Sequence, residues 1–130
     1  MRALQQHLPH ALPVRHEDKF TKGVPDLSIS YSGHTSWWEI KYADPYIQSS
    51  KLQRYMCEQL DARGFFCRYV VFRRGQADKW PRQIRVVKPH DFAHWRTLGF
   101  QVSEGAFDYR ALVRYIQERH DRHDYSHSPK

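Results

Sequence analysis

The segment spanning residues 65–72 constrains the fold most strongly, because every residue in it except Arg68 is apolar. Most of these residues are also aromatic or β-branched, which favours a strand. A strand without polar alternation is typical of a central position in a sheet whose two faces are both covered. We therefore predict an α/β fold in which helices flank a mixed β-sheet.

Hydrophobic spacing and turn signals predict the remaining elements. Helices are expected before Pro9 and at residues 50–62, 91–98 and 106–119, and strands at residues 27–31, 36–42, 65–72 and 83–88. The first two strands are expected to form a hairpin closed by a loop at residues 32–35. A chain of this length can bury one core, so we predict a single domain over residues 1–120 and a polar tail at residues 121–130.

The chain is basic, and its positive charge is unevenly distributed. Lysine and arginine number 21 against 14 aspartates and glutamates, which gives a net charge of +7. Residues 62–88 hold eight of the basic residues and a single acid, Asp78. Such a segment suits a polyanion such as nucleic acid. A basic surface that only keeps the protein in solution would have the same composition.

The sequence lacks the signatures of membrane and secreted proteins. No apolar run approaches the roughly 20 residues that a membrane-spanning helix needs, and the first ten residues lack the apolar segment of a secretory signal. Cys57 and Cys67 are too few for a disulfide framework or a four-ligand zinc site, so we expect reduced thiols in a cytoplasmic protein. His120 and the histidines after it are expected to be solvated.

Alternation along the first two strands sorts their side chains by face. Glu39 and Lys41 share one face of the second strand, and Asp26 precedes the first strand in the matching phase. Pairing through a loop at residues 32–35 places Tyr31 opposite Ser36, Ser28 opposite Glu39 and Asp26 opposite Lys41. The two carboxylates and the amine are therefore expected to point from one face at the open end of the hairpin.

This grouping has a chemical use. Two neighbouring carboxylates repel each other unless a cation lies between them, and oxygen ligands on a partly hydrated site suit Mg²⁺ or Mn²⁺. The bound ion lowers the pKa of its water, and a nearby ammonium stabilises charge on a phosphoryl group. The residues thus favour metal-assisted phosphodiester hydrolysis. The plainer interpretation is an ordinary cross-strand ion pair, which contributes under about 1 kcal/mol.

The order of these residues along the chain resembles a known nuclease family. G-V-P-D-L at residues 23–27, followed by W-E-I-K at residues 38–41, resembles the PD-(D/E)XK nuclease superfamily, and within it the small VRR-NUC-like and phage-encoded nucleases. The resemblance covers roughly residues 15–75. It implies a restriction-endonuclease-like mixed sheet with an α-β-β-α-β core, in a protein of a bacterial or phage-infected cell.

The resemblance also implies a role for each residue of the motif. Asp26 and Glu39 would ligate Mg²⁺ or Mn²⁺ together with the backbone carbonyl of Ile40, and Lys41 would position or activate the attacking water. Similar phage proteins place a glutamate before the G-x-P-D turn, which here is Glu17, and it would reach the metal shell and serve a second ion. The neighbouring Asp18 is an alternative to Glu17 for that role.

The remaining site residues lie outside the two motifs. Gln53 fits the glutamine that the family carries on its helix, where it would bond the lysine, the water or a phosphate, but Ser50-x-x-Gln53 also has the spacing of a helix capping box. Trp37 shares the face of Glu39, and packing is favoured over stacking on a base. Residues expected to contact DNA phosphates are Arg54, Arg73, Arg74, Lys79 and Arg82.

The sequence therefore predicts a Mg²⁺- or Mn²⁺-dependent deoxyribonuclease that needs no small-molecule cofactor and no membrane. The resemblance suggests branched DNA, such as a Holliday junction or a flap, as the substrate. Because one chain offers one site, cutting both strands needs two copies, and we expect a homodimer. The main alternative is a non-catalytic nucleic-acid-binding module on the same fold, which charge supports equally well. A protein-interaction domain would leave the grouping of Asp26, Glu39 and Lys41 to chance.

Overall fold

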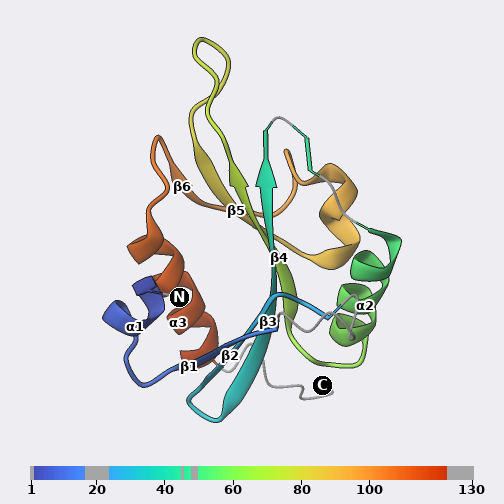
Figure 1. Cartoon of the computed structure of the whole chain (residues 1–130), viewed down its shortest axis with the longest axis vertical. Coiled ribbons are helices and arrows are strands. Elements are labelled where there is room, and N and C mark those ends of the chain that lie inside the picture. Colours follow the sequence, from blue (N-terminus) through green and yellow to red (C-terminus); the bar gives the residue numbers. More distant parts are fainter. Residues whose placement is uncertain (1, 17–23, 45, 48–49, 123–130) are drawn as a thin grey trace.

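The computed structural model describes residues 2–16, 24–44, 46–47 and 50–122 (Figure 1). Its elements are α1 (Arg2–His7), β1 (Leu12–Arg15), β2 (Leu27–Tyr31), β3 (His34–Ala43), α2 (Lys51–Ala62), β4 (Cys67–Arg73), β5 (Gln83–Val87), the 3₁₀ helix η1 (Pro89–His94), β6 (Phe100–Glu104) and α3 (Tyr109–Asp121). The strands form one six-stranded sheet in the order β1-β2-β3-β4-β5-β6. β3 and β4 pair in parallel, and the other neighbouring strands named here pair antiparallel.

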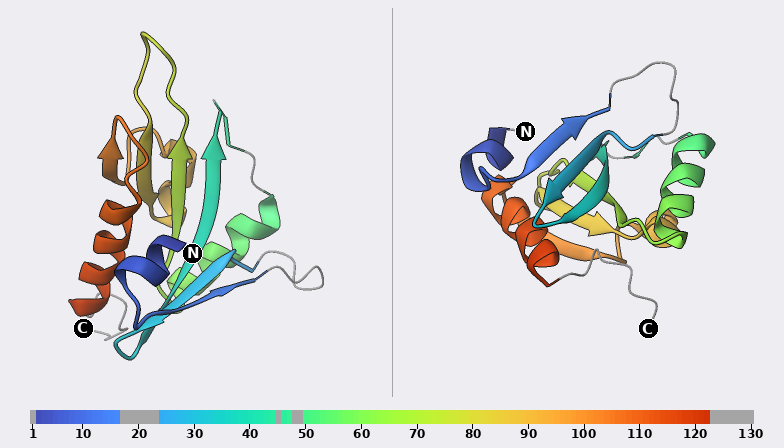
Figure 2. Two further views of the ribbon diagram at one scale, coloured as in Figure 1. Left: turned by 60° about the vertical axis from the view of Figure 1, so that its left-hand side comes forward. Right: turned by 90° about the horizontal axis from the view of Figure 1, so that it is seen from below.

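Helices cover both faces of this sheet, as predicted from the apolar run at residues 65–72. Figure 2 shows α1 and α3 on one face and α2 with η1 on the other. A first core, between the sheet and α1 and α3, contains Leu4, Trp38 and Ile116. A second core, between the sheet and α2 and η1, contains Cys57, Tyr69 and Phe92. The central strand β4 contributes to both cores, so the prediction of a mixed α/β protein with flanking helices is confirmed.

Three segments differ from the sequence predictions. β1 and β6 were not predicted, and both are short edge strands whose side chains are largely exposed. Pro13 lies in β1, where an edge strand tolerates a residue without an N–H. Residues 91–98 were expected to be a short helix, but the helical segment is 3₁₀, begins at Pro89 and ends at His94. Residues 95–98 continue as a turn.

The hairpin between β2 and β3 is tighter than predicted. Its loop is only Ser32 and Gly33, both at positive φ (54° and 80°), as a two-residue turn of type I′ requires. Tyr31 therefore pairs with His34 rather than with Ser36, and Ser28 pairs with Trp37 rather than with Glu39. Continuing this register places Asp26 next to Glu39 rather than Lys41. Because the slip is two residues, every side chain keeps its predicted face.

The helices α2 and α3 begin at side-chain caps. Ser50 and Gln53 form the predicted capping box at the start of α2, and Gly64 follows its end at a φ of +96°. Asp108 caps α3, which runs a little later than the predicted 106–119. Among the residues that the structure describes, no helix is long and apolar enough to cross a membrane. Residues 123–130, most of the predicted tail, lie outside the described residues.

Candidate active site

Glu39 lies in the middle of β3 and has no exposed surface. Its side chain lies on the same face of β3 as that of Trp37, which packs against the second core beneath α2. Within the described part of the chain, neither of its carboxylate oxygens meets a hydrogen-bond donor. A buried carboxylate without a donor costs several kcal/mol, so such groups are rare unless a proton or a bound cation compensates them. This side chain is the strongest sign of a functional site.

The protonation of Glu39 reflects these surroundings. Burial is the largest cause that raises the pKa of Glu39, from 4.5 to about 9. The neighbouring Asp26 raises it further, because the two carboxyl groups can share one proton and because their negative charges repel each other. The positive charge of Lys41 acts in the opposite direction and lowers it. Glu39 therefore interacts with both Asp26 and Lys41.

Asp26 is held at the point where β2 begins. Its Oδ2 accepts a hydrogen bond of 2.9 Å from the backbone N–H of Ile40. The pairing of β2 with β3 ends at Trp38, so the Asp26 carboxylate accepts the hydrogen bond from Ile40 that a backbone carbonyl of a longer β2 would accept. The N–H and C=O of one strand residue point to the same neighbour, so the Ile40 carbonyl also points to the side of β3 where Asp26 lies. The predicted oxygen donors Asp26, Glu39 and Ile40 are therefore adjacent.

Lys41 is fixed by α2. Its Nζ donates a hydrogen bond of 2.7 Å to Oε1 of Gln53. The same oxygen lies 3.4 Å from the backbone N–H of Ser50, which donates to it in the capping box. Gln53 therefore combines the two roles that the sequence left open, since it caps α2 and also holds the lysine. The position of α2 along the sheet sets where the Lys41 ammonium lies.

The end of β1 contributes a residue that the sequence did not identify. The ring of His16 stacks on Trp37, with 5.1 Å between the ring centroids, and its Nε2 lies 2.9 Å from Oγ of Ser28. Its backbone N–H donates to the carbonyl of Asp26. Trp37 also packs against the second core, in agreement with the predicted packing role. Glu17, which follows His16, lies outside the described residues, as does Asp18.

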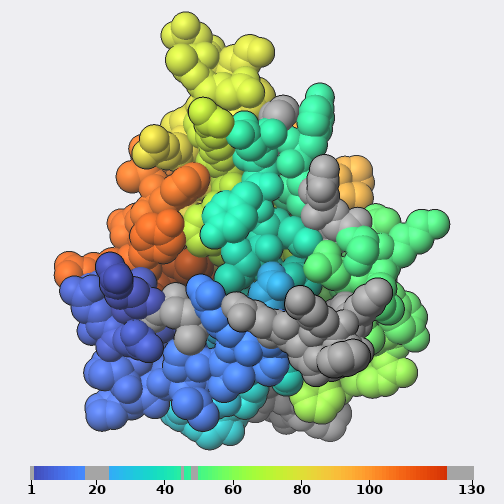
Figure 3. Space-filling model, in the orientation of Figure 1, coloured from blue at the N-terminus to red at the C-terminus, as the bar shows by residue number. Residues whose placement is uncertain are grey.

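The residues predicted to contact DNA are spread over several surfaces. Arg54 is exposed on α2. Arg74 is exposed and forms an ion pair of 2.8 Å with Asp44. Lys79 and Arg82 are exposed in the loop between β4 and β5, which projects from the molecule in Figures 1 and 3. Arg73 is the member of the set that lies on the same face of the sheet as Glu39, at the end of β4.

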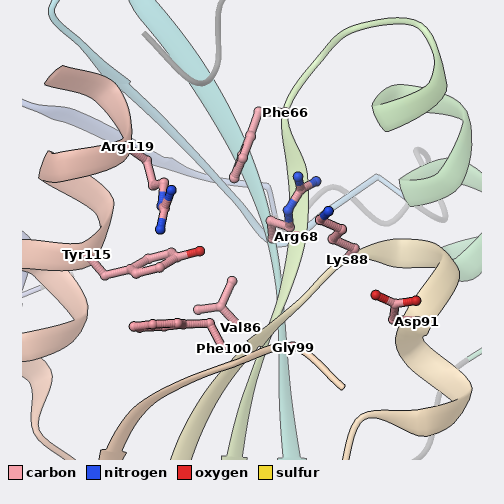
Figure 4. A pocket seen from close by; sticks show the side chains of 9 residues that line it. All are labelled: Phe66, Arg68, Val86, Lys88, Asp91, Gly99, Phe100, Tyr115 and Arg119. Carbon is pink, nitrogen blue, oxygen red and sulfur yellow. The ribbon is translucent and has the colours of Figure 1, made fainter. Parts of the chain in front are cut away.

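The basic segment at residues 62–88 does not form one patch. Arg68 and Lys88, together with Arg119 from α3, line an open groove of about 520 Å³ on the other side of the sheet (Figure 4). The ring of Phe100 stacks on Tyr115 in its wall, and Arg68 is paired with Asp61. This groove lies away from Asp26 and Glu39, so its charge does not belong to the candidate site.

Comparisons with known proteins supply no family: no protein-family model matches this chain, and no curated protein matches it. The case for the site therefore rests on its donor set. Among the described residues, no three His, Cys, Asp or Glu side chains form a metal-binding group. Two carboxylates and one carbonyl nevertheless lie on adjacent residues of β3 and at the start of β2, and they are all oxygen donors, which Mg²⁺ and Mn²⁺ prefer. The orphaned oxygens of Glu39 fit such an ion.

Proposed function

We propose that this protein is a Mg²⁺- or Mn²⁺-dependent DNA nuclease of the PD-(D/E)XK type, with a restriction-endonuclease-like arrangement of its sheet and helices. One observation carries the proposal. A fully buried glutamate without a hydrogen-bond donor among the described residues lies beside a second carboxylate and a lysine, on one face of a sheet. An ordinary surface ion pair would leave Glu39 exposed, so the structure argues against that interpretation.

Each residue has a distinct part in the reaction. The carboxylates of Asp26 and Glu39 and the carbonyl of Ile40 would hold the ion, which when bound supplies a Lewis acid and a water of lowered pKa. The bond from the Ile40 N–H orients Asp26, so that one carboxylate oxygen is fixed and the other is free to bind. The bond from Lys41 to Gln53 keeps the ammonium beside the acids, where it can stabilise negative charge on a phosphoryl oxygen.

The wider proposal follows from the sequence and the charge. The exposed basic residues Arg54, Lys79 and Arg82 would contact the DNA backbone. A homodimer would place two sites on two strands, and branched DNA is the substrate that the resemblance suggests. Both cysteines are buried free thiols, which favours a reducing compartment such as the cytoplasm.

The test is cleavage of plasmid, single-stranded and branched DNA with Mg²⁺ or Mn²⁺ present. We expect Glu39→Gln and Lys41→Ala to lower the rate by roughly 100-fold or more, the usual loss when a group that stabilises transition-state charge is removed. Glu58→Gln and Lys51→Ala, which remove the same charges from exposed positions on α2, are matched controls. Folding of all four variants is checked by circular dichroism.

The same experiment separates the main alternative. A non-catalytic nucleic-acid-binding module would bind DNA with a steep salt dependence and would show no cleavage that depends on the metal. Parent protein that binds but does not cut, or folded Glu39 and Lys41 variants that cut as well as their controls, would contradict the proposed function.

A further inference from the structure

Arg73 lies on the face of the sheet that carries the candidate site. In the parallel pairing of β3 with β4, Glu39 is next to Tyr69 and Lys41 is next to Val71, so Arg73 is the next residue of β4 with the same orientation. From strand spacings its Cα lies roughly 8 Å from that of Lys41. Neighbouring phosphates of one DNA strand lie roughly 7 Å apart, because the strand winds around the helix as it rises about 3.4 Å per nucleotide, so this separation corresponds to about one step along a strand.

Aromatic rings hold the guanidinium group of Arg73 in place. It lies over Trp80, 4.1 Å from the ring centroid, and also over Trp95, at 5.4 Å. The guanidinium of Arg96 lies over the same Trp95 ring at 4.7 Å. Trp80 is itself anchored by a hydrogen bond from its Nε1 to the carbonyl of Arg74. Two arginines thus converge on one tryptophan at the end of β4.

A third arginine lies beneath them. Arg85 on β5 is buried and pairs with Val71, which places it on the same face as Arg73. Its hydrogen-bond acceptors among the described residues are neutral: Nε donates to the carbonyl of Trp95 at 3.0 Å, and the two Nη groups lie near the Leu98 carbonyl and the Gln101 side chain. The three guanidinium groups therefore come from three different elements, β4, β5 and the turn after η1.

Arg73 has no acidic partner among the residues that the structure describes. Within the described residues Arg73 forms no ion pair, and its Nε is buried without an acceptor. Burial, Arg96 and Arg85, in that order, lower the pKa of Arg73. Two other arginines of the same segment do have acids, since Arg68 pairs with Asp61 and Arg74 pairs with Asp44. Gathered like charges are unfavourable by themselves, and an anion would relieve the repulsion.

We propose that Arg73, supported by Arg85 and Arg96, binds the backbone phosphate next to the phosphate that enters the candidate active site. This inference rests on the proposed function, which assigns phosphodiester cleavage to that site. A guanidinium presents a planar fork of donors that matches phosphate oxygens. Stacking on Trp80 and Trp95 holds the fork in one plane, so that little conformational entropy is lost when the phosphate binds.

Binding is measured with fluorescently labelled single-stranded and duplex DNA in EDTA, where metal-dependent cleavage is absent. Arg73→Gln is compared with Arg110→Gln, which removes the same charge from an exposed position on α3, on the opposite face of the sheet (Figure 2). We expect Arg73→Gln to weaken binding about tenfold and to reduce the slope of log K against log salt by roughly 0.7–0.9, the effect of one lost phosphate contact. Arg110→Gln should leave the slope unchanged.

A purely structural role for Arg73 predicts a different result. Arg73→Gln would then lower the thermal unfolding midpoint, while the folded variant would bind DNA like Arg110→Gln. Binding is therefore recorded well below both midpoints, and equal affinities and slopes for the two variants would overturn the inference. Arg73→Lys, which keeps the charge but loses the planar fork, is expected to bind with an intermediate affinity.

Failure of the inference and failure of the proposed function are distinguishable. A smaller slope of log K against log salt for Arg73→Gln, without metal-dependent cleavage by the parent, supports the phosphate contact and contradicts the nuclease. Cleavage by the parent with no binding defect in Arg73→Gln supports the nuclease and contradicts the phosphate contact. Where the parent cuts, an uncharged methylphosphonate at the phosphate next to the cut should slow the parent and not slow Arg73→Gln further. Equal slowing of both proteins would contradict the assigned position.

Discussion

Metal binding at the candidate site is expected to release a proton from Glu39. In the metal-free protein the pKa of Glu39 is raised to about 9, chiefly by burial, so the side chain is protonated at neutral pH. A divalent ion needs the carboxylate, and it therefore has to displace this proton. The affinity for Mg²⁺ or Mn²⁺ should rise with pH up to about pH 9 and level off above it.

The size of the effect follows from one proton per ion. Between pH 6 and pH 8 the dissociation constant should fall about tenfold per pH unit, or roughly 100-fold in all, which corresponds to about 3 kcal/mol of binding free energy. A carboxylate with an ordinary pKa would be ionised throughout this range and would give no such dependence. The dependence of the dissociation constant on pH therefore reports on the raised pKa of the buried Glu39.

Titration calorimetry with Mn²⁺, in buffers of different ionisation enthalpy, measures both the affinity and the number of protons released. We expect close to one proton per ion for the parent and for the control Glu58→Gln. Glu39→Gln should bind the ion much more weakly and release none. Affinity that does not depend on pH, or equal binding by Glu39→Gln, would refute the reasoning.

Three further changes test the fold that supports the site. His120 is fully buried, with ring nitrogens 3.0 Å from Oγ of Ser36 and from the carbonyl of Tyr31, and burial is the main cause that lowers its pKa to about 4. Stability should therefore be lost as pH falls from about 6.5 to 4, by at most about 3 kcal/mol, and His120→Gln should flatten that acid limb in urea titrations. Ser32→Asn should raise the free energy of unfolding by roughly 0.5–1 kcal/mol, because asparagine tolerates the positive φ of the hairpin turn better than serine. Ser50→Ala should lower it by about 1 kcal/mol through loss of the α2 cap, and an unchanged value would contradict the capping box.

Local patterns predicted the elements whose apolar residues repeat with a regular period. The expected bounds agree with the observed ones to within three residues for β2, β3, β4, β5, α2 and α3, and α1 lies before Pro9 as expected. The faces of β2 and β3 were also correct, because the period of two tolerates a slip of two residues. The register itself was wrong, since Ser32 adopts a left-handed conformation that its residue type does not announce.

Features that depend on distant parts of the chain were not predictable. β1 and β6 are strands because they pair with β2 and β5, and their own exposed residues do not indicate this pairing. His16 was missed because β1, which it follows, was not predicted. His120 was expected to be solvated, but α3 returns against the β2–β3 hairpin and buries it beneath Ser36. Polar residues are exposed in most proteins, so nothing local indicates that His120 is buried.

The candidate site also combines features that local spacing predicts with features that depend on distant parts of the chain. The spacing of Asp26, Glu39 and Lys41 predicted that these side chains share a face. It did not predict that Glu39 would be buried without a donor, that Asp26 would bind the Ile40 amide or that Arg73 would gather with two other arginines. Each of these depends on how β4, β5 and α2 assemble around β3.

A crystal of the protein soaked in Mn²⁺ at about pH 8 tests the central claim most directly, because the anomalous scattering of manganese locates the ion. We expect a peak between the carboxylates of Asp26 and Glu39, with oxygen distances of about 2.1 Å and the carbonyl of Ile40 as a further ligand. Density that leaves these oxygens without an ion, while Mn²⁺ binds elsewhere or not at all, would contradict the assignment of a metal-dependent active site.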